Sequence, residues 1–201
     1  MAELILGSTS VYRRQLLERM GVTFRCEPPG VDEDAYKLRG LTPDALAHLL
    51  AREKALKVSE RFPGAVVIGS DQVAELDGHV FDKPGTVERA CEQLAQLQGR
   101  THRLITAVCV VDATGGLHEF VNVYRLTMRA LTDTQIRRYV ERDQPLNCCG
   151  SFRIESLGVA LFSEVEGDDP TAIEGLPLME LTAVLSTLGM DPLGSGEAVR
   201  P

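Results

Sequence analysis

Short apolar runs alternate with amphipathic segments along the first half of the chain. Residues 4–6 and 65–68 are continuous apolar runs, which indicates two short buried strands. A Gly-Ser pair follows each run, at residues 7–8 and 69–70. Because Asp71 comes directly after the second pair, the pattern predicts that its carboxylate projects from the C-terminal end of a strand, where α/β proteins tend to place ligand groups.

Five amphipathic segments have the apolar spacing of helices. They are predicted to begin near Ser10, Thr42, Thr86, Thr132 and Pro177. The second has a hydroxyl N-cap followed by proline and an acidic residue, which is the usual start of a helix. The fourth begins with the capping-box pattern, a threonine followed three residues later by glutamine.

Turn residues predict two hairpins and one further strand. Asp77-Gly78 is typical of a tight hairpin. Residues 101–111 and 117–128 are β-rich and flank a short Gly-containing turn, so they are expected to pair as a long hairpin. Residues 159–162 are predicted as a later strand, and residues 31–34 as an irregular acidic stretch. This mixture predicts an α/β fold with a mixed sheet flanked by helices.

The length and composition indicate one domain. The chain has 201 residues, 44% of them apolar, which suffices for one substantial core but is short for two. We assign residues 1–194 to this domain. We expect the Pro- and Gly-containing end, residues 195–201, to be a disordered tail.

The charge pattern excludes several classes of partner. The net charge is −8 and no block of Lys or Arg occurs, so nucleic-acid polymers are not expected partners. The chain shows neither a signal sequence with a basic and then an apolar region nor a run of apolar residues long enough to span a bilayer. We therefore expect a cytoplasmic protein without a membrane partner. Its five cysteines have no C-x-x-C spacing, so neither a zinc site nor a disulfide framework is indicated.

Candidate phosphate-binding residues follow the first strand. Arg13 and Arg14 fall in the first turn of a helix that begins with hydroxyl residues, and the free N–H groups of such a turn favour an anion. Two solvated arginines on an amphipathic helix would explain the pair equally well. Lys54 and Lys83 would add positive charge if they converge with the arginines.

Candidate metal ligands are carboxylates. Asp71 could share a Mg²⁺ ion with Asp32 or Glu33, because this ion usually takes one or two carboxylates together with phosphate oxygens and water. The alternative is that Gly-Ser-Asp forms only a turn. The phosphate-binding P-loop, the dinucleotide-binding glycine motif and the G-x-S-x-G elbow are all missing, which disfavours those three enzyme classes.

The chain resembles the Maf family of nucleoside triphosphate pyrophosphatases. The resemblance rests on six blocks in order: residues 4–10 with Arg13-Arg14, then 31–33, 53–55, 69–73, 83–84 and 150–152. It extends over nearly the whole chain to about Gly194 and is strongest to the branch that acts on 7-methyl-GTP.

The resemblance implies a fold like that of the inosine triphosphatases, with a deep cleft between two lobes. It implies a nucleoside triphosphate substrate, a divalent metal ion (Mg²⁺ or Mn²⁺) as cofactor, and Asp71 as the proton acceptor that activates water and as a metal ligand. It also implies that the phosphate and metal site is lined by Ser10, Arg13, Arg14, Glu33, Lys54 and Lys83.

Three further residues are implied to select the base, namely Tyr12, Gln72 and Glu155. They suit a methylated guanine, because N7-methylation makes the ring cationic. An aromatic face then adds cation–π attraction, and a carboxylate accepts the hydrogen bonds of N1–H and the exocyclic amine. The 7-methyl-GTP branch often has tryptophan where this chain has Tyr12, and the smaller ring should stack less strongly.

Two alternatives remain open at the level of the sequence. One is a pyrimidine pyrophosphatase of the same family, acting on dTTP and UTP, and the other is a nucleotide-binding regulator of septum formation with little turnover. The retention of Asp71 favours an enzyme over a binding protein. The sequence does not determine the oligomeric state, for which a homodimer is one arrangement considered.

Overall fold

The computed structural model describes residues 2–194, so the tail expected at residues 195–201 lies outside the described residues. One mixed seven-stranded sheet forms its centre, in the order β2-β1-β3-β5-β6-β7 with β4 paired to β3. The strands are β1 (Leu4–Leu6), β2 (Arg25–Cys26), β3 (Val66–Leu76), β4 (His79–Phe81), β5 (Thr101–Val111), β6 (Leu117–Met128) and β7 (Phe162–Glu166). β1 runs parallel to β2 and β3, and the other pairings are antiparallel.

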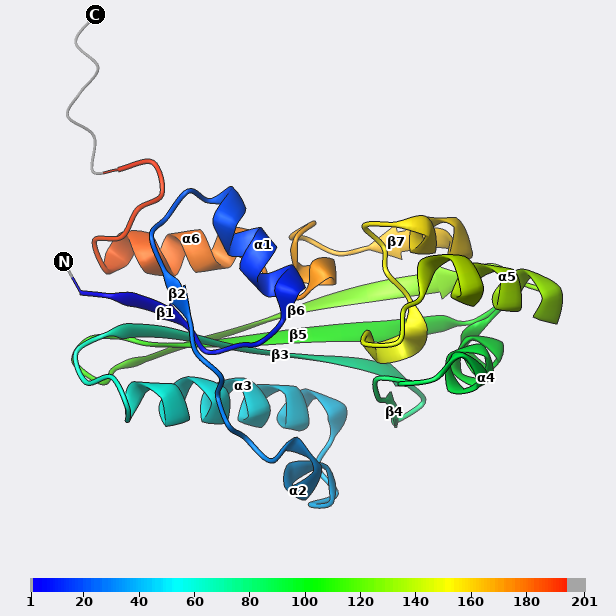
Figure 1. Cartoon of the computed structure of the whole chain (residues 1–201), viewed down its shortest axis with the longest axis horizontal. Coiled ribbons are helices and arrows are strands. Elements are labelled where there is room, and N and C mark those ends of the chain that lie inside the picture. Colours follow the sequence, from blue (N-terminus) through cyan, green and yellow to red (C-terminus); the bar gives the residue numbers. More distant parts are fainter. Residues whose placement is uncertain (1, 195–201) are drawn as a thin grey trace, which may run out of the picture.

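Helices cover both faces of the sheet, as Figure 1 shows. They are α1 (Val11–Arg19), α2 (Glu33–Lys37), α3 (Pro43–Ser59), α4 (Val87–Leu97), α5 (Asp133–Asp143) and α6 (Leu178–Thr187). Three short 3-10 helices are η1 (Cys149–Ser151), η2 (Leu157–Leu161) and η3 (Ala172–Glu174). No helix in the part of the chain that the structure describes is both long and apolar enough to cross a bilayer.

The long strands β3, β5 and β6 connect two lobes (Figure 1). In the first lobe, α3 packs on one face of the sheet around Leu50, while α1 and α6 pack on the other around Leu16. In the second lobe, α4 and α5 cover the far ends of the same strands around Leu94. The expectation of a mixed α/β fold with two lobes is therefore confirmed.

The local signals for most elements are also confirmed. The hydroxyl groups of Thr42, Thr86 and Thr132 each accept a hydrogen bond from a backbone N–H in the first turn of a helix. The capping box at Thr132 is complete. Asp77 and Gly78 both have positive φ angles, as a tight hairpin turn requires, and β5 pairs with β6 along its whole length.

The prediction that Asp71 ends a strand is wrong. β3 continues without interruption through Gly69 and Asp71, pairing with β5 from Val67 to Glu75. The glycine does not make a turn. A Cβ at Gly69 would lie 2.3 Å from the backbone O of Ala51 in α3, so the glycine allows the helix to pack closely on the strand.

Two other segments differ from the prediction. The expected strand at residues 159–162 is mostly the 3-10 helix η2, and the strand β7 begins only at Phe162. Here the chain folds back tightly, since a Cβ at Gly158 would lie 2.2 Å from the O atom of Arg153. The short helix α2 begins within the stretch expected to be irregular, and Asp32 caps it by accepting a hydrogen bond from the N–H of Ala35.

Candidate active site

A cleft of about 990 Å³ opens beside the middle of β3. Its walls come from the start of α1, from α2 and α3, from the segment after β4, and from the loop that carries η1. It contains nine of the ten residues that the sequence analysis assigned to a site: Ser10, Tyr12, Arg13, Glu33, Lys54, Asp71, Gln72, Lys83 and Glu155. The tertiary structure thus brings together residues from widely separated parts of the chain.

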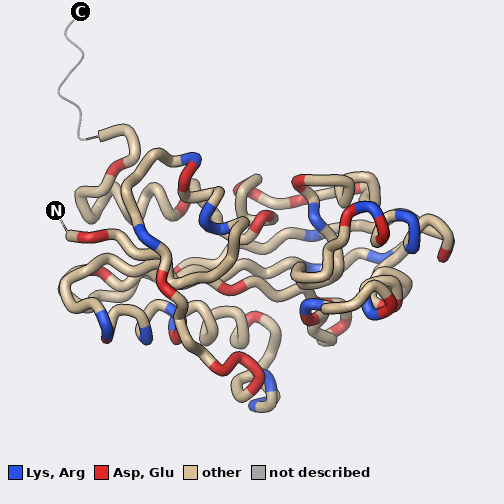
Figure 2. Tube along the Cα trace, in the orientation of Figure 1, with Lys and Arg blue, Asp and Glu red and all other residues tan. Residues whose placement is uncertain are grey.

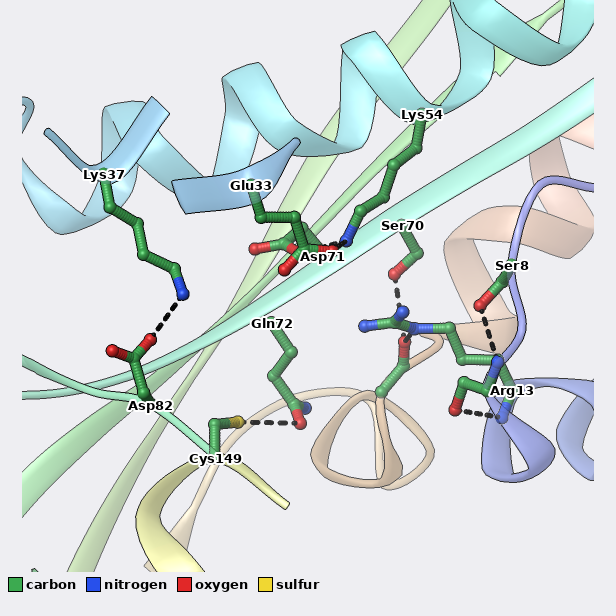
Figure 3. Close-up of polar contacts among 12 residues, drawn as sticks. Ser8, Arg13, Glu33, Lys37, Lys54, Ser70, Asp71, Gln72, Asp82 and Cys149 are labelled. Carbon is green, nitrogen blue, oxygen red and sulfur yellow. Dashed lines mark hydrogen bonds and ion pairs between the residues drawn. The ribbon is translucent and has the colours of Figure 1, made fainter. Parts of the chain in front are cut away.

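A buried ammonium group joins two carboxylates at the centre of this cleft. Lys54 Nζ lies 2.6 Å from Asp71 Oδ1 and 2.7 Å from Glu33 Oε1 (Figure 3). The side chains of Lys54 and Asp71 are 7% and 9% exposed, whereas that of Glu33 is 38% exposed. The two carboxylates therefore converge on one point from different elements, β3 and α2.

The strand geometry explains how Asp71 reaches this position. Successive side chains of a strand point to opposite faces. Asp71 points to the face covered by α3, where Lys54 lies on the buried side of the helix. Ser70 and Gln72 point to the other face and donate hydrogen bonds to carbonyl groups of residues 172–175. The close approach of α3 at Gly69 keeps Lys54 within reach of the strand.

The environments of the two carboxylates shift their proton affinities in opposite directions. Burial raises the pKa of Asp71, although the nearby Lys54 and Arg13 act against this rise. Burial acts in the same sense on Glu33, but Lys54, Lys83 and Lys37 outweigh it and lower the pKa of that carboxyl. Glu33 is therefore a permanent negative charge at neutral pH, while Asp71 is the better proton acceptor.

Arg13, in the first turn of α1, reaches the carbonyl group that also holds Ser70 of β3. Its Nε donates a hydrogen bond of 2.9 Å to the carbonyl of Gly175, which also accepts from the hydroxyl of Ser70 (Figure 3). Ser10 is the N-cap of α1, and its Oγ accepts from the N–H of Arg13. The start of α1 thus presents N–H groups and a guanidinium to the cleft, an arrangement suited to phosphate.

Arg14 is not brought to the cleft. Its Nε donates to Glu18 Oε1 at 2.8 Å on the outer side of α1, and its side chain is 63% exposed. The helix separates adjacent residues by about 100° of rotation, so only one of the two arginines can face the strand. Lys83 is exposed and lines the cleft. Three of the four expected cations therefore converge.

The three residues assigned to base recognition, Tyr12, Gln72 and Glu155, line the same cleft. Gln72 Nε2 donates to Thr106 Oγ1 at 2.9 Å and to the carbonyls of Ala172 and Ile173. Its Oε1 accepts from the Cys149 thiol at 3.6 Å (Figure 3). The NH₂ group of Gln72 is therefore engaged with protein acceptors, and its oxygen, which already accepts from Cys149, has one further lone pair for a ligand.

Several residues of the cleft were not anticipated from the sequence. Arg153 lies near both Tyr12 and Glu155, and the only local signal for it is its position two residues before Glu155. Lys37 Nζ pairs with Asp82 Oδ1 at 2.7 Å between α2 and the segment after β4. No local pattern indicates this second contact, because its partners are distant in the sequence.

The cleft is less acidic than the chain as a whole. Acidic and basic positions are interspersed along the chain without a basic segment (Figure 2), and the net charge is −8. Yet the cleft lining contains as many basic as acidic residues, the basic ones being Arg13, Lys37, Lys54, Lys83, Arg89 and Arg153. This local balance lowers the repulsion that an anionic ligand would meet in an otherwise acidic protein.

The fold and the cleft define a mixed α/β protein with a candidate anion-binding catalytic centre. The family model described as Maf-like protein matches residues 3–188, and the chain belongs to this family. The five cysteines are free thiols.

Similar proteins extend over almost the full length of the chain. A 7-methyl-GTP pyrophosphatase of Xanthomonas axonopodis pv. citri (strain 306) is 48% identical over 189 residues, which cover 94% of this chain and 98% of that protein. A 7-methyl-GTP pyrophosphatase of Cupriavidus pinatubonensis is 45% identical over 190 residues, 94% of each chain. A HAM1 protein from Coxiella burnetii has a structure with a TM-score of 0.46 at 12% identity, covering 93% of this chain and 100% of that chain.

Proposed function

We propose that this protein hydrolyses the α–β phosphoanhydride of 7-methyl-GTP, releasing the nucleoside monophosphate and pyrophosphate. The observation that carries the proposal is the buried Lys54 between Asp71 and Glu33, in a cleft that Arg13 and Lys83 also line. Relatives 45–48% identical over nearly the whole chain are named 7-methyl-GTP pyrophosphatases, which supports the same reaction and substrate.

The chemistry follows from the positions of these groups. Asp71 accepts a proton from water as the water oxygen bonds to the α-phosphorus, and the bond from that phosphorus to the bridging oxygen breaks. The electron pair leaves with pyrophosphate, where the charges of Arg13, Lys54 and Lys83 stabilise it. Burial raises the pKa of Asp71, which makes it a stronger base than an ordinary aspartate.

The two carboxylates suit a divalent cation. Glu33 Oε1 and Asp71 Oδ1 both lie within 2.7 Å of the same Nζ, so they already converge on one positive charge. No group of three or more His, Cys, Asp or Glu side chains able to hold a metal occurs among residues 2–194. A Mg²⁺ or Mn²⁺ ion bound by these two residues would take its remaining ligands from phosphate and water, and would neutralise phosphate charge.

The residues assigned to base recognition suit a methylated guanine. Tyr12 offers an aromatic face, and the Glu155 carboxylate can accept the two hydrogen bonds that guanine donates. We assign to Gln72 a supporting role, because its amide nitrogen donates to the carbonyls of residues 172–173 and its oxygen already accepts from Cys149. This pattern favours 7-methyl-GTP over dTTP and UTP, whose pyrimidine bases carry no positive charge.

A panel of nucleotides tests the proposal. The purified protein is incubated with 7-methyl-GTP, GTP, dTTP and UTP in the presence of Mg²⁺ or Mn²⁺, and the phosphorus products are identified by ³¹P NMR. We expect pyrophosphate, with 7-methyl-GTP as the best substrate. Release of orthophosphate would contradict cleavage of the α–β bond, and preference for dTTP and UTP would contradict the assigned base.

The same panel separates an enzyme from a regulator. Tight binding of nucleotide without turnover at saturating metal would favour the binding protein considered above. We further expect a cytoplasmic protein that does not bind nucleic-acid polymers. Light scattering of the purified chain would measure whether it forms the homodimer considered from the sequence.

A further inference from the structure

Arg153 lies between the two groups assigned to the base. Its guanidinium carbon lies 5.6 Å from the centre of the Tyr12 ring, within the range of a cation–π contact. Its Nε donates to Glu155 Oε1 at 3.4 Å. The same guanidinium therefore contacts an aromatic face and a carboxylate, which are the two groups that a cationic base would use.

Other contacts hold this arginine at the wall of the cleft. Arg153 Nη1 donates to the carbonyl of Asp143 at 3.1 Å, and its backbone N–H lies 3.1 Å from the hydroxyl of Tyr139. The side chain is 30% exposed and that of Glu155 is 25% exposed. The arginine is thus held at the wall of the cleft by Asp143 and remains partly exposed to it.

Charge distinguishes the two guanine nucleotides at this position. Guanine and 7-methylguanine donate the same hydrogen bonds to a carboxylate, but only the methylated base carries a positive ring. Arg153 already neutralises Glu155, so a cationic base meets a like charge next to its partner, whereas a neutral base does not. The repulsion should weaken binding of the methylated base selectively.

We propose that Arg153 is a specificity-determining residue, which competes with a cationic base for Tyr12 and Glu155 and so limits the preference for methylated over unmethylated guanine. This inference rests on the proposed function of the cleft. Arg153 acts on the base and not on the phosphates, so replacing it should change KM and leave kcat unchanged.

The experiment compares Arg153→Gln with Arg153→Lys in the full-length protein. We expect Arg153→Gln to lower KM for 7-methyl-GTP by about two- to fivefold, as befits a partly exposed ion pair, and to leave KM for GTP and both kcat values nearly unchanged. Arg153→Lys keeps the charge and should retain the wild-type ratio of the two KM values. Arg137→Gln is the matched control, since Arg137 is 57% exposed on α5 and pairs only loosely with Glu141.

Each other result overturns the proposal. A rise in KM for 7-methyl-GTP would make Arg153 a direct ligand, and equal changes for both nucleotides would give it only a structural role. Thermal melting of each variant checks that the contact to Asp143 is not needed for folding.

If the wild-type protein hydrolyses no nucleotide, the proposed function fails separately. Titration with 7-methyl-GMP and GMP then measures the selectivity of Arg153 without turnover, and an unchanged affinity ratio in Arg153→Gln overturns this inference.

Discussion

Lys54 Nζ and Asp71 Oδ1 form an ion pair of 2.6 Å whose two side chains are both less than a tenth exposed. Buried charges are expensive unless they are paired, so this contact couples the position of α3 to that of β3. Burial still raises the pKa of Asp71 despite the lysine. The pair therefore leaves the aspartate able to accept a proton, which is the property that catalysis requires.

Replacement of Asp71 by asparagine should abolish most of the turnover. Asn has the same shape but cannot accept the proton of the attacking water, and general bases typically contribute about 10²–10⁴-fold to a rate. We expect a loss of kcat in this range with an unchanged circular dichroism spectrum. Asp77→Asn, in the turn that follows β3, is the control and should keep its activity. A nearly normal kcat for Asp71→Asn would remove the residue from the base role.

Lys54→Met should move the pH dependence as well as lower the rate. In the wild-type protein, activity rises with pH as Asp71 loses its proton, and Lys54 acts to lower the pKa of Asp71. Without the lysine, burial and Glu33 raise this pKa further, so the acidic limb of kcat/KM should shift to higher pH. The pH–rate profile is the measurement, with Lys57→Met on the same helix as the control. A lower rate with an unshifted limb would argue against this coupling.

The two neighbouring arginines should behave differently. Arg13 lines the cleft, and Arg13→Ala should lower kcat/KM by about 10- to 100-fold, the usual cost of a lost hydrogen bond between charged groups. Arg14 pairs with Glu18 outside the cleft, so Arg14→Ala should stay within about threefold of wild type. Steady-state kinetics on the best nucleotide would show this. Equal losses would mean that Arg14 turns into the cleft when nucleotide binds.

Gly69→Ala should destabilise the protein and weaken its activity together. The new Cβ would lie 2.3 Å from Ala51 O and 2.5 Å from Ala55 N, both of them backbone atoms of α3. The helix must move away, at a cost of about 1–3 kcal/mol, and Lys54 moves with it. Gly7→Ala has its nearest contacts at 3.2 Å and should cost less. Thermal melting and kcat measure the two effects, and a variant that melts at the wild-type temperature would contradict the close packing.

His102 should make the protein less stable in acid. Both ring nitrogens are buried without a hydrogen-bond partner, and burial lowers the pKa from 6.5 to about 4. Between these two values the unfolded chain binds a proton that the folded protein does not, so stability falls as the pH falls through this window and is constant for this group above it. The full effect is about 3 kcal/mol.

Urea unfolding at about pH 7 and about pH 4.5 checks the role of His102. His102→Leu cannot titrate and should lose less stability between these two pH values than the wild-type protein loses, by about 2–3 kcal/mol. Carboxyl groups titrate in both proteins and contribute equally to both losses, so the difference between the two losses of stability belongs to His102. Identical losses would show that His102 gains its proton in the folded state as readily as in the unfolded chain.

The local elements of this fold were predictable because their causes are local. A hydroxyl N-cap such as Thr132, with a glutamine three residues later, satisfies N–H groups of its own helix wherever that helix lies. The Asp77-Gly78 turn likewise depends on the φ angles of two adjacent residues. The order of six short blocks along the chain further identified the family, although each block alone is common.

The role of Gly69 could not be predicted in the same way. In the sequence, Gly-Ser-Asp is typical of a turn, and its continuation as a strand depends on pairing with β5 and on contact with α3. Likewise, nothing in the pair Arg13-Arg14 indicates which residue faces the strand. That choice depends on the rotation of α1 as it packs against the sheet.

The sequence by itself determined the capped helices, the hairpins, the family and the identity of the candidate acids and bases, because each of these follows from residue types at short spacing. Only the tertiary structure decided that Lys54 lies between Glu33 and Asp71, that Arg14 faces away, and that Arg153 reaches Tyr12. These relationships join residues from different elements, and their distances depend on how the helices pack on the sheet.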